Sequence, residues 1–320
     1  MWTNRFYKHV ICITFLLFSS LAESKKSEKR VQLDGLAINY QFMDDASANL
    51  ETELNALITR AFAIYTELFN GLPRDKQGKE YSEFTLHVKQ GTNMGGEADP
   101  GIIMLTWNNK QLFGLASWQT LLLHELFHLW SAESFRYEDG REHWFNEGFA
   151  EYYAYKTAVQ LGLISERDML SFAAIPIGHY FSSLGLRNIS MRNAGKHNKT
   201  KFENYFLVYH GGWVVAMVLD HDIRKRTNDK ANLDDLMRWM YTNFPREKSL
   251  YNIGDIIAGL NQLTKFDYHD FFELYVDGTE PLPLTKHLPI SDALWAFEFK
   301  KRERAKFNRL YRTLGFEVVH

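Results

Sequence analysis

The sequence is poor in cysteine and in net charge, and it contains no repeat. Its 320 residues include one cysteine, Cys12, and 37 basic against 39 acidic residues give a formal net charge of −2. That balance does not favour nucleic acid or an anionic membrane surface, so we expect no nucleic-acid partner. The sequence shows no internal repeat and no low-complexity tract, which argues against a repeat architecture.

The segment 1–24 is typical of a secretory signal peptide. Arg5 and Lys8 precede an apolar run over 10–18, and small residues around Ala22 suit a cleavage site. The run is short for a membrane span, and an uncleaved anchor is the alternative. We therefore expect a secreted or periplasmic protein with no integral membrane segment after cleavage. Because Cys12 lies inside this segment, the mature chain would have no disulfide and no thiol chemistry.

The whole chain is rich enough in apolar residues to bury a sizeable core. Its 320 residues are 45% hydrophobic and 15% aromatic, which suits one large domain or two closely packed ones. Apolar periodicity predicts a helix over 50–69 and strands over 84–88, over 101–107 and within 31–42. The glycine-rich link 91–101 is predicted to be a turn or a binding loop. Residues 25–110 are therefore predicted to form a small α/β subdomain.

The second part, residues 111–320, is predicted to be a mainly helical catalytic subdomain. The predicted helices cover 118–131, 144–161 and 209–226, with others opening at Asn232 and Asp267. Ser165 and Asp168 have the spacing of a capping box. We expect a polar loop over 181–204 and a solvated basic helix over 300–312. The predicted fold class is α+β, a small mixed sheet followed by a mainly helical lobe.

The most informative segment is His124-Glu-Leu-Phe-His128, on the predicted helix 118–131. Two histidines at i and i+4 lie on one helix face, one turn apart, and can reach a single Zn²⁺. The opposite face is apolar and is predicted to face the core; its residues are Leu122, Leu126, Leu129 and Trp130. Imidazoles among leucines are costly to bury unless a partner such as a metal ion satisfies them. Alone, so short a motif is equally compatible with chance.

Glu147 strengthens the metal interpretation. Eighteen residues, 129 to 146, separate it from His128, and it lies on the first turn of the next predicted helix. Its carboxylate can be a third ligand and leave a fourth position open, as in catalytic zinc sites. Glu151 lies one turn further on the same face and can accept the second ring N–H of a liganding histidine. The alternatives are an ordinary surface charge for Glu151, and Mn²⁺ or Co²⁺ in place of zinc.

Glu125 follows the first predicted ligand directly and points beside the metal. We predict that it is the general base, which takes a proton from a zinc-activated water and passes it to the leaving amine. Zinc lowers the pKa of such a water toward about 7 and polarises the scissile carbonyl. These residues together predict a hydrolase with one zinc ion.

Several segments resemble known peptidases. Residues 144–153 resemble the second zinc signature of gluzincin peptidases. Four further segments resemble the glycyl aminopeptidase family: 124–130, 160–165, 209–224 and 270–283. The aminopeptidase N and leukotriene hydrolase group is more distantly similar. The resemblance spans about residues 115–283. It implies a thermolysin-like zinc peptidase catalytic domain and a peptide or protein substrate.

The resemblance also implies a tyrosine whose hydroxyl hydrogen-bonds the oxyanion of the tetrahedral intermediate. The family pattern is Tyr-x-Lys-Gly, and this chain reads Tyr209-His210-Gly211-Gly212, without the lysine. We assign the oxyanion role to Tyr209. The alternative is a core tyrosine on an apolar helix. His210 is either a second donor or a histidine beside a loop.

A further segment, Gly95-Gly96-Glu97, resembles the family's Gly-Gly-x-Glu-His loop, which lies along the substrate on an edge strand. The spacing is shorter here and no histidine follows. The resemblance makes Gly95, Gly96 and Glu97 candidate substrate-binding residues. It also makes Glu97 the candidate that holds the free ammonium of a substrate.

The sequence therefore predicts a zinc metallopeptidase, more specifically an aminopeptidase. One alternative is an endopeptidase with the same chemistry. The other is a non-catalytic zinc-containing binding protein, which the altered Tyr-x-Lys-Gly segment supports and which the retained Glu125 argues against.

Overall fold

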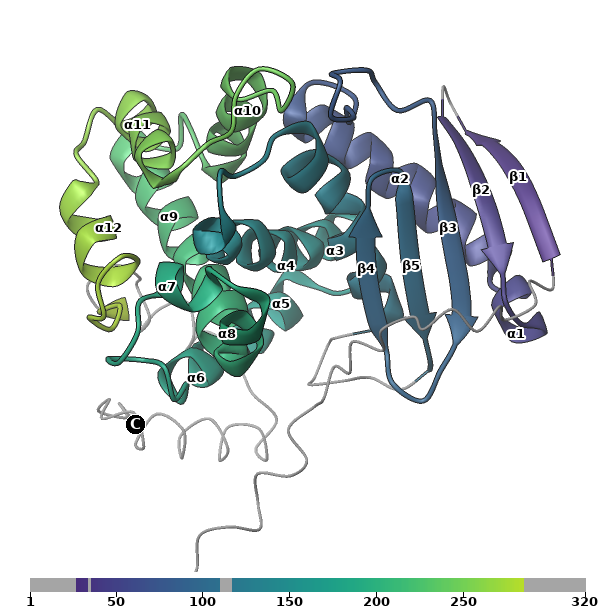
Figure 1. Ribbon diagram of the computed structural model, residues 1–320, viewed down its shortest axis with the longest axis horizontal. Coiled ribbons are helices and arrows are strands. Elements are labelled where there is room, and N and C mark those ends of the chain that lie inside the picture. The colour runs from purple at the N-terminus through teal and green to yellow at the C-terminus, as the bar shows by residue number, and fades with distance from the viewer. Residues whose placement is uncertain (1–26, 34–35, 110–116, 285–320) are drawn as a thin grey trace, which may run out of the picture.

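The computed structural model describes residues 27–33, 36–109 and 117–284 of the chain, with the sheet at one side and most of the helices at the other (Figure 1). The predicted signal peptide, Cys12 and the predicted helix over 300–312 lie outside the described residues. Among the residues described, no helix is both long and apolar enough to cross a membrane. The division into two subdomains stays a prediction.

A five-stranded mixed sheet occupies the N-terminal part of the described chain. Its strands are β1 (Ser27–Leu33), β2 (Leu36–Phe42), β3 (Glu83–Gln90), β4 (Gly95–Asp99) and β5 (Ile102–Trp107). Their order is β1-β2-β3-β5-β4, so β4 is an edge strand. It pairs antiparallel with β5, whereas β3 is parallel to both β2 and β5.

One face of the sheet packs against a long helix. Alternate residues of β3 and β5 are buried, as the period of a strand requires. They share a core with the buried stripe of helix α2 (Glu51–Phe69). The Tyr40 hydroxyl on β2 donates to Asn55 Oδ1 on α2 at 2.8 Å. The Tyr65 hydroxyl on α2 donates to the Leu123 carbonyl at 3.0 Å, which joins the sheet layer to the helical part.

The helical part follows β5. Its α-helices are α3 (Trp118–His128), α4 (His143–Gln160), α5 (Glu166–Phe172), α6 (Ala174–Phe181), α7 (Met191–Gly195), α8 (Asn198–Glu203), α9 (Gly211–Thr227), α10 (Leu233–Asn243), α11 (Ile253–Thr264) and α12 (His269–Tyr275). A further short helix, α1 (Asp45–Ala48), lies earlier in the chain, before α2. Two π-helical segments, Leu129–Ser134 and Phe206–His210, extend α3 and precede α9. The α+β fold predicted from the sequence is confirmed.

Most predicted elements occur where the pattern places them. The four residues predicted to face the core from α3 are fully buried. The capping box at Ser165 is present, with the Asp168 backbone N–H donating to Ser165 Oγ and the Ser165 backbone N–H donating to Asp168 Oδ2.

The strand predicted within 31–42 is present as β2, and residues 31–33 belong to β1, which pairs antiparallel with β2. Two local predictions were wrong. The glycine-rich link contains β4, whose backbone is satisfied by β5 in spite of its poor strand propensity. The predicted loop 181–204 contains α7 and α8, which are too short for a periodic signal. Helix α7 begins instead at a Ser190 side-chain cap.

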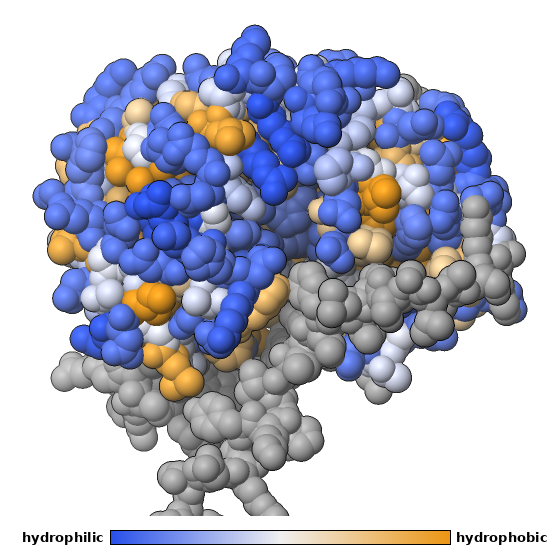
Figure 2. All heavy atoms as spheres, in the orientation of Figure 1, coloured by the Kyte–Doolittle hydropathy of each residue, from blue (hydrophilic) through white to orange (hydrophobic). Residues whose placement is uncertain are grey.

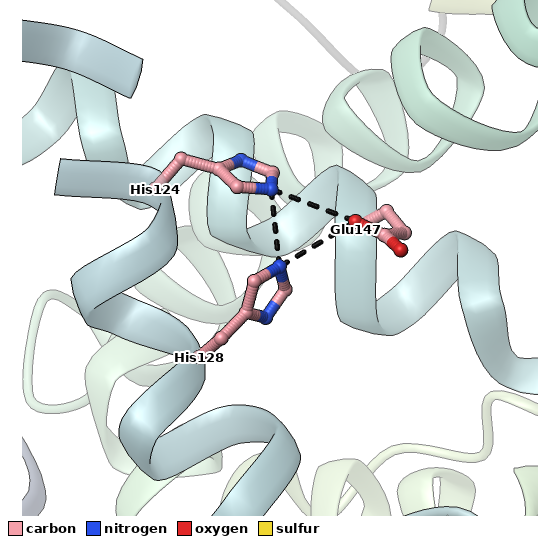
Figure 3. A group of neighbouring side chains, drawn as sticks. All are labelled: His124, His128 and Glu147. Atoms are coloured by element: carbon pink, nitrogen blue, oxygen red, sulfur yellow. Dashed lines mark hydrogen bonds and ion pairs between the residues drawn. The ribbon is translucent and has the colours of Figure 1, made fainter. Parts of the chain in front are cut away.

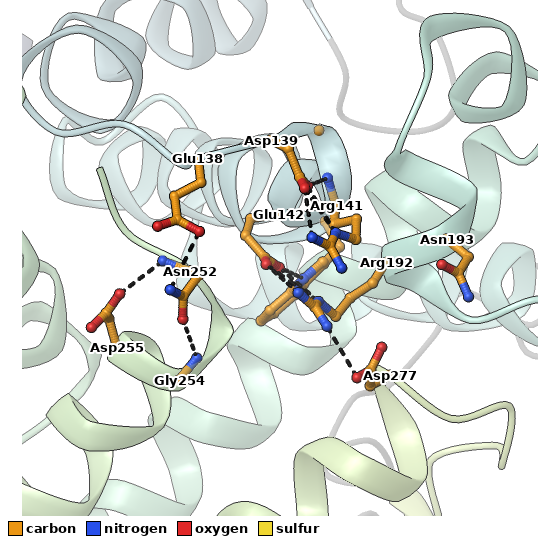
Figure 4. A network of polar contacts seen from close by, with 12 residues as sticks. Glu138, Asp139, Arg141, Glu142, Arg192, Asn193, Asn252, Gly254, Asp255 and Asp277 are labelled. Carbon is orange, nitrogen blue, oxygen red and sulfur yellow. Dashed lines mark hydrogen bonds and ion pairs between the residues drawn. The ribbon is translucent and has the colours of Figure 1, made fainter. Parts of the chain in front are cut away.

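A buried ion network fixes the start of α4 (Figure 4). Arg192 on α7 donates from Nη2 to Glu142 Oε1 at 2.8 Å, and its Nη1 lies 3.0 Å from Asp277 Oδ2. Glu142 immediately precedes α4 and also accepts from the Trp144 indole N–H at 3.1 Å. The side chains of Arg192 and Glu142 are only 9% and 3% exposed. This network therefore ties the first turn of α4 to α7 and to the end of α12.

We predict that Arg192→Met destabilises the fold by about 3–5 kcal/mol, because it leaves the Glu142 carboxylate buried without its cation. Urea unfolding at equilibrium measures this change. The matched control is Arg141→Met, which removes a neighbouring arginine that also appears in Figure 4. The side chains of Arg141 and its partner Asp139 are 43% and 40% exposed. The control should cost less than about 1 kcal/mol. Equal losses in the two variants would contradict the prediction.

Candidate metal centre

Helices α3 and α4 bring His124, His128 and Glu147 together (Figure 3). The two Nε2 atoms lie 3.0 Å apart, and Glu147 Oε2 lies 3.5 Å from each of them. The histidines come from successive turns of α3, and Glu147 comes from the first turns of α4. Three ligand atoms from two helices thus converge on one point.

The spacing of these atoms fits a tetrahedral zinc ion. Ligands about 2.0–2.1 Å from zinc in a tetrahedron lie about 3.3 Å from one another. The observed separations of 3.0 and 3.5 Å bracket that value. Two imidazole lone pairs at this distance repel unless a proton or a cation lies between them, so the donor set suits a metal ion.

A close contact between helices sets the position of Glu147. Gly148, the next residue of α4, packs against Gly212 of α9. A Cβ on Gly212 would lie 2.9 Å from the Trp144 carbonyl carbon and 3.0 Å from the Gly148 Cα. Only glycine allows the two backbones to come this close. The contact holds Glu147 beside the start of α9.

His128 is oriented by a short chain of hydrogen bonds. Its Nδ1 lies 3.2 Å from Ser131 Oγ, and the Ser131 hydroxyl donates to Asn146 Oδ1 at 3.4 Å. Because that hydroxyl gives its hydrogen to Asn146, it accepts one from Nδ1–H of His128. With the proton on Nδ1, the Nε2 lone pair faces the site, as a metal ligand requires. Ser131 lies in the π-helical segment after α3, and Asn146 immediately precedes Glu147.

Glu125 is held against the edge of the sheet. It is buried on α3, and a Cβ on Gly96 of β4 would lie 2.7 and 2.8 Å from its Cγ and Cδ. The missing side chain of Gly96 therefore makes the space for this carboxyl. Burial raises the pKa of Glu125 to about 7, and the charge of Glu147 adds to the effect, while His124 and Lys201 oppose it.

Tyr209 approaches the site from a π-helical turn and not from α9, where the sequence had placed it. Its ring stacks on Tyr205 with centroids 4.1 Å apart. Burial raises the pKa of Tyr209 well above its usual range, and the negative charge of Glu147 adds to it. The hydroxyl is therefore protonated and able to donate. Such π-turns occur frequently at functional sites.

The position at which the family pattern has a lysine is close to two neighbouring side chains. A Cβ on Gly211 would lie 3.0 Å from the Met191 methyl carbon and 3.1 Å from Tyr180 Cδ2. A side chain here would require these neighbours to shift slightly.

Glu151 contacts a histidine other than the two predicted ligands. Its Oε1 lies 3.5 Å from His210 Nε2, and His210 Nδ1 lies 3.0 Å from His179 Nδ1. Burial opposes the ionisation of Glu151, but the charge and hydrogen bond of His210, together with the charges of His124 and His179, outweigh it and lower the pKa of the carboxyl. No hydrogen bond from Glu151 to His124 or His128 occurs within the described part of the chain. Its predicted role toward those ligands stays a prediction.

Strand β4 presents different residues on its two faces. Gly96 and Ala98 pair in register with Leu105 and Ile103, which are buried. Because side chains alternate along a strand, Glu97 projects from the opposite face to Gly96. Glu97 is still near enough for its charge to raise the pKa of Glu125. Glu97 therefore lies at the rim of the site, while Ala98 occupies the inward position.

Two of the three converging side chains are partly exposed. Those of His124 and Glu147 are 14% and 13% exposed, in contrast to the fully buried Leu122, Leu123 and Leu126 of α3. Figure 2 shows a hollow with a mainly hydrophilic surface between the helical part and the sheet.

Three contacting residues were missed from the sequence. Ser131 lies at i+3 from His128, and Asn146 immediately precedes Glu147 in the sequence. Both residues could therefore have been predicted to lie near the ligands. Lys201, whose Nζ lies 3.2 Å from Glu147 Oε1, comes from the predicted loop and had no such signal.

Comparison with known proteins supports a peptidase. The sequence model of the M61 glycyl aminopeptidase family matches residues 117–214, which contain the three converging residues and Tyr209. The resemblance to glycyl aminopeptidases is thereby confirmed. The fold is similar to the crystal structure of an aminopeptidase N family protein from Idiomarina loihiensis, with a TM-score of 0.68 and 17% identity. That match covers 81% of this chain and 48% of the other, so the chain spans about half of its relative. No curated protein matches the chain.

We predict that Gly96→Ala lowers kcat by about 10²-fold, because the new methyl group displaces the Glu125 carboxyl. Steady-state peptide hydrolysis measures it, and the zinc content should stay unchanged. The control is Gly95→Ala, since a Cβ on Gly95 meets nothing within 4 Å. A normal kcat in Gly96→Ala, or an equal loss in Gly95→Ala, would show that this space is not needed.

Proposed function

We propose that this chain is a zinc-dependent metallopeptidase, more specifically an aminopeptidase, acting on peptides or proteins. The observation that carries the proposal is the convergence of His124, His128 and Glu147 beside the buried Glu125. A purely structural zinc site has four protein ligands and needs no adjacent carboxylate. The proposal includes a secreted or periplasmic location, which rests on the sequence of residues 1–24 alone.

His124, His128 and Glu147 would hold one zinc ion. When bound, the ion supplies Lewis-acid polarisation of a carbonyl and acidifies a water molecule. The Ser131–Asn146 chain keeps the proton of His128 on Nδ1 and away from the ion. The buried ion network at Glu142 keeps the first turn of α4, and with it Glu147, in place.

Glu125 serves as general base and then as general acid. Its carboxylate takes the proton from the attacking water and passes it to the nitrogen of the leaving amine. Glu125 is buried on α3, and its carboxyl occupies the space that Gly96 leaves. These two features fix the direction in which the carboxylate points. A base confined in this way needs little reorganisation during the reaction.

Tyr209 donates a hydrogen bond to the oxyanion of the tetrahedral intermediate. Stacking on Tyr205 limits the motion of its ring, and its raised pKa keeps the hydroxyl protonated. Preorganised donors of this kind stabilise charge that develops only in the transition state.

Edge strand β4 supports the binding of an extended peptide. Among the described strands it pairs with β5 alone, and it lies beside Glu125, so a substrate can add to its other edge by main-chain hydrogen bonds. An aminopeptidase must also hold the free ammonium, and Glu97 at the rim of the site is the candidate. The inward position held by Ala98 favours the alternative, an endopeptidase with the same chemistry.

We predict that Glu125→Gln retains zinc but loses nearly all turnover, because the amide cannot accept the proton of the attacking water. Metal analysis of the purified variant and peptide hydrolysis by mass spectrometry measure the two properties. Zinc-loaded Glu125→Gln with substantial turnover would refute the proposed mechanism. Removal of zinc with a chelator should abolish turnover of the unsubstituted protein, and zinc should restore it.

We predict that peptides with a free amino terminus are cleaved and that the same peptides are resistant once N-acetylated, because the acetyl group removes the ammonium that Glu97 would hold. A matched pair of peptide libraries, digested and read by mass spectrometry, measures this difference. Glu97→Gln should raise KM for the free peptides more than it changes kcat. Internal cleavage of the blocked library would identify an endopeptidase.

A further inference from the structure

Lys201 is a buried lysine that the proposed chemistry does not use. It lies on α8, and its side chain is 8% exposed. Its Nζ lies 3.2 Å from Glu147 Oε1 and 5.8 Å from the centre of the Tyr209 ring. A lysine is rarely buried unless it is paired, so the contact with Glu147 is a specific feature of this site.

The two oxygens of Glu147 have different partners. Oε2 lies 3.5 Å from both histidine Nε2 atoms, while Oε1 lies beside the ammonium of Lys201. The carboxylate is thus held from both sides, with one oxygen toward the metal position and one away from it. A carboxylate without the lysine can turn and offer both oxygens to the same cation.

Lys201 does not strengthen metal binding by its charge. An ammonium beside a ligand repels the cation that the ligand binds, so charge alone would weaken the affinity for zinc. Its geometry offers a different benefit: a ligand that uses one oxygen leaves the remaining coordination position open, as catalytic zinc sites require.

We propose that Lys201 is a positioning residue, which holds Oε1 of Glu147 so that only Oε2 is available to the metal. This inference rests on the proposed function, since it concerns the same metal position. Lys201 acts through Glu147 and need not touch the substrate.

The test compares Lys201→Met with the unsubstituted protein and with Lys199→Met. Methionine keeps the length and apolar stem of lysine and removes the ammonium. Lys199 lies on the same helix, is 85% exposed and lies 4.0 Å from Glu203, so it controls for the loss of one positive charge from α8. Three quantities are measured on each protein: zinc affinity by chelator competition, the visible absorption of the Co²⁺-loaded form, and kcat.

In Lys201→Met we expect zinc affinity equal to or higher than in the unsubstituted protein, and weaker visible absorption of Co²⁺, as its coordination number rises. We expect kcat to fall about 10–100-fold, the size of effect typical for residues that orient ligands. Lys199→Met should match the unsubstituted protein in all three. An unchanged Co²⁺ spectrum in Lys201→Met, or a zinc affinity that falls together with kcat, would overturn the positioning role.

Lys201→Gln provides a second variant if Lys201→Met does not fold, because the amide keeps a polar group against Glu147 without the charge. The same readouts apply, and because the amide can still donate to Oε1, we expect changes in the same direction but of smaller size. Failure of both variants to fold would make Lys201 a residue of stability alone and would also overturn the inference. Failure of the unsubstituted protein to bind Zn²⁺ or Co²⁺ would instead refute the proposed function, on which the inference rests.

Discussion

The contact between Gly148 and Gly212 is the constraint on which the rest of the site depends. It lets α4 and α9 approach until backbone touches backbone, which any side chain would prevent. Glu147 immediately precedes one glycine, and Tyr209 comes three residues before the other. The approach of the two helices therefore places a carboxylate from α4 and a hydroxyl from the turn before α9 beside the histidines of α3.

The second constraint is electrostatic, because several carboxyls share one largely buried region. At Glu125 burial raises the pKa and His124 and Lys201 offset only part of the rise, whereas partners hold Glu147 and Glu151 ionised. Burial alone would raise the pKa of Glu147, but the contacts with His124 and His128 and the charge of Lys201 outweigh it. The site thus separates a carboxyl suited to proton transfer from one suited to hold a cation.

The sheet contributes space more than side chains. Gly96 leaves room for Glu125, and within the described residues β4 pairs on one side only, with β5. The alternation along β4 turns Glu97 away from the face on which Gly96 and Ala98 lie and on which Gly96 meets Glu125. The positions of Gly96, Glu97 and Ala98 at the site therefore depend on this one strand, whereas the three converging residues come from α3 and α4.

The sequence by itself determined the α+β class, the helices α2, α3 and α4, and the convergence of His124, His128 and Glu147. Local rules carry this information, since i, i+4 spacing on a helix fixes which side chains share a face. Only the tertiary structure decided that Lys201 contacts Glu147 and that Glu151 contacts His210. In each pair the two residues come from segments that are far apart in the sequence, and their spacing along the chain does not predict the contact. The packing of α4 against α9 and of α8 against the site brings these residues together. Contacts between distant segments depend on side-chain volume and burial, which a local sequence pattern does not predict.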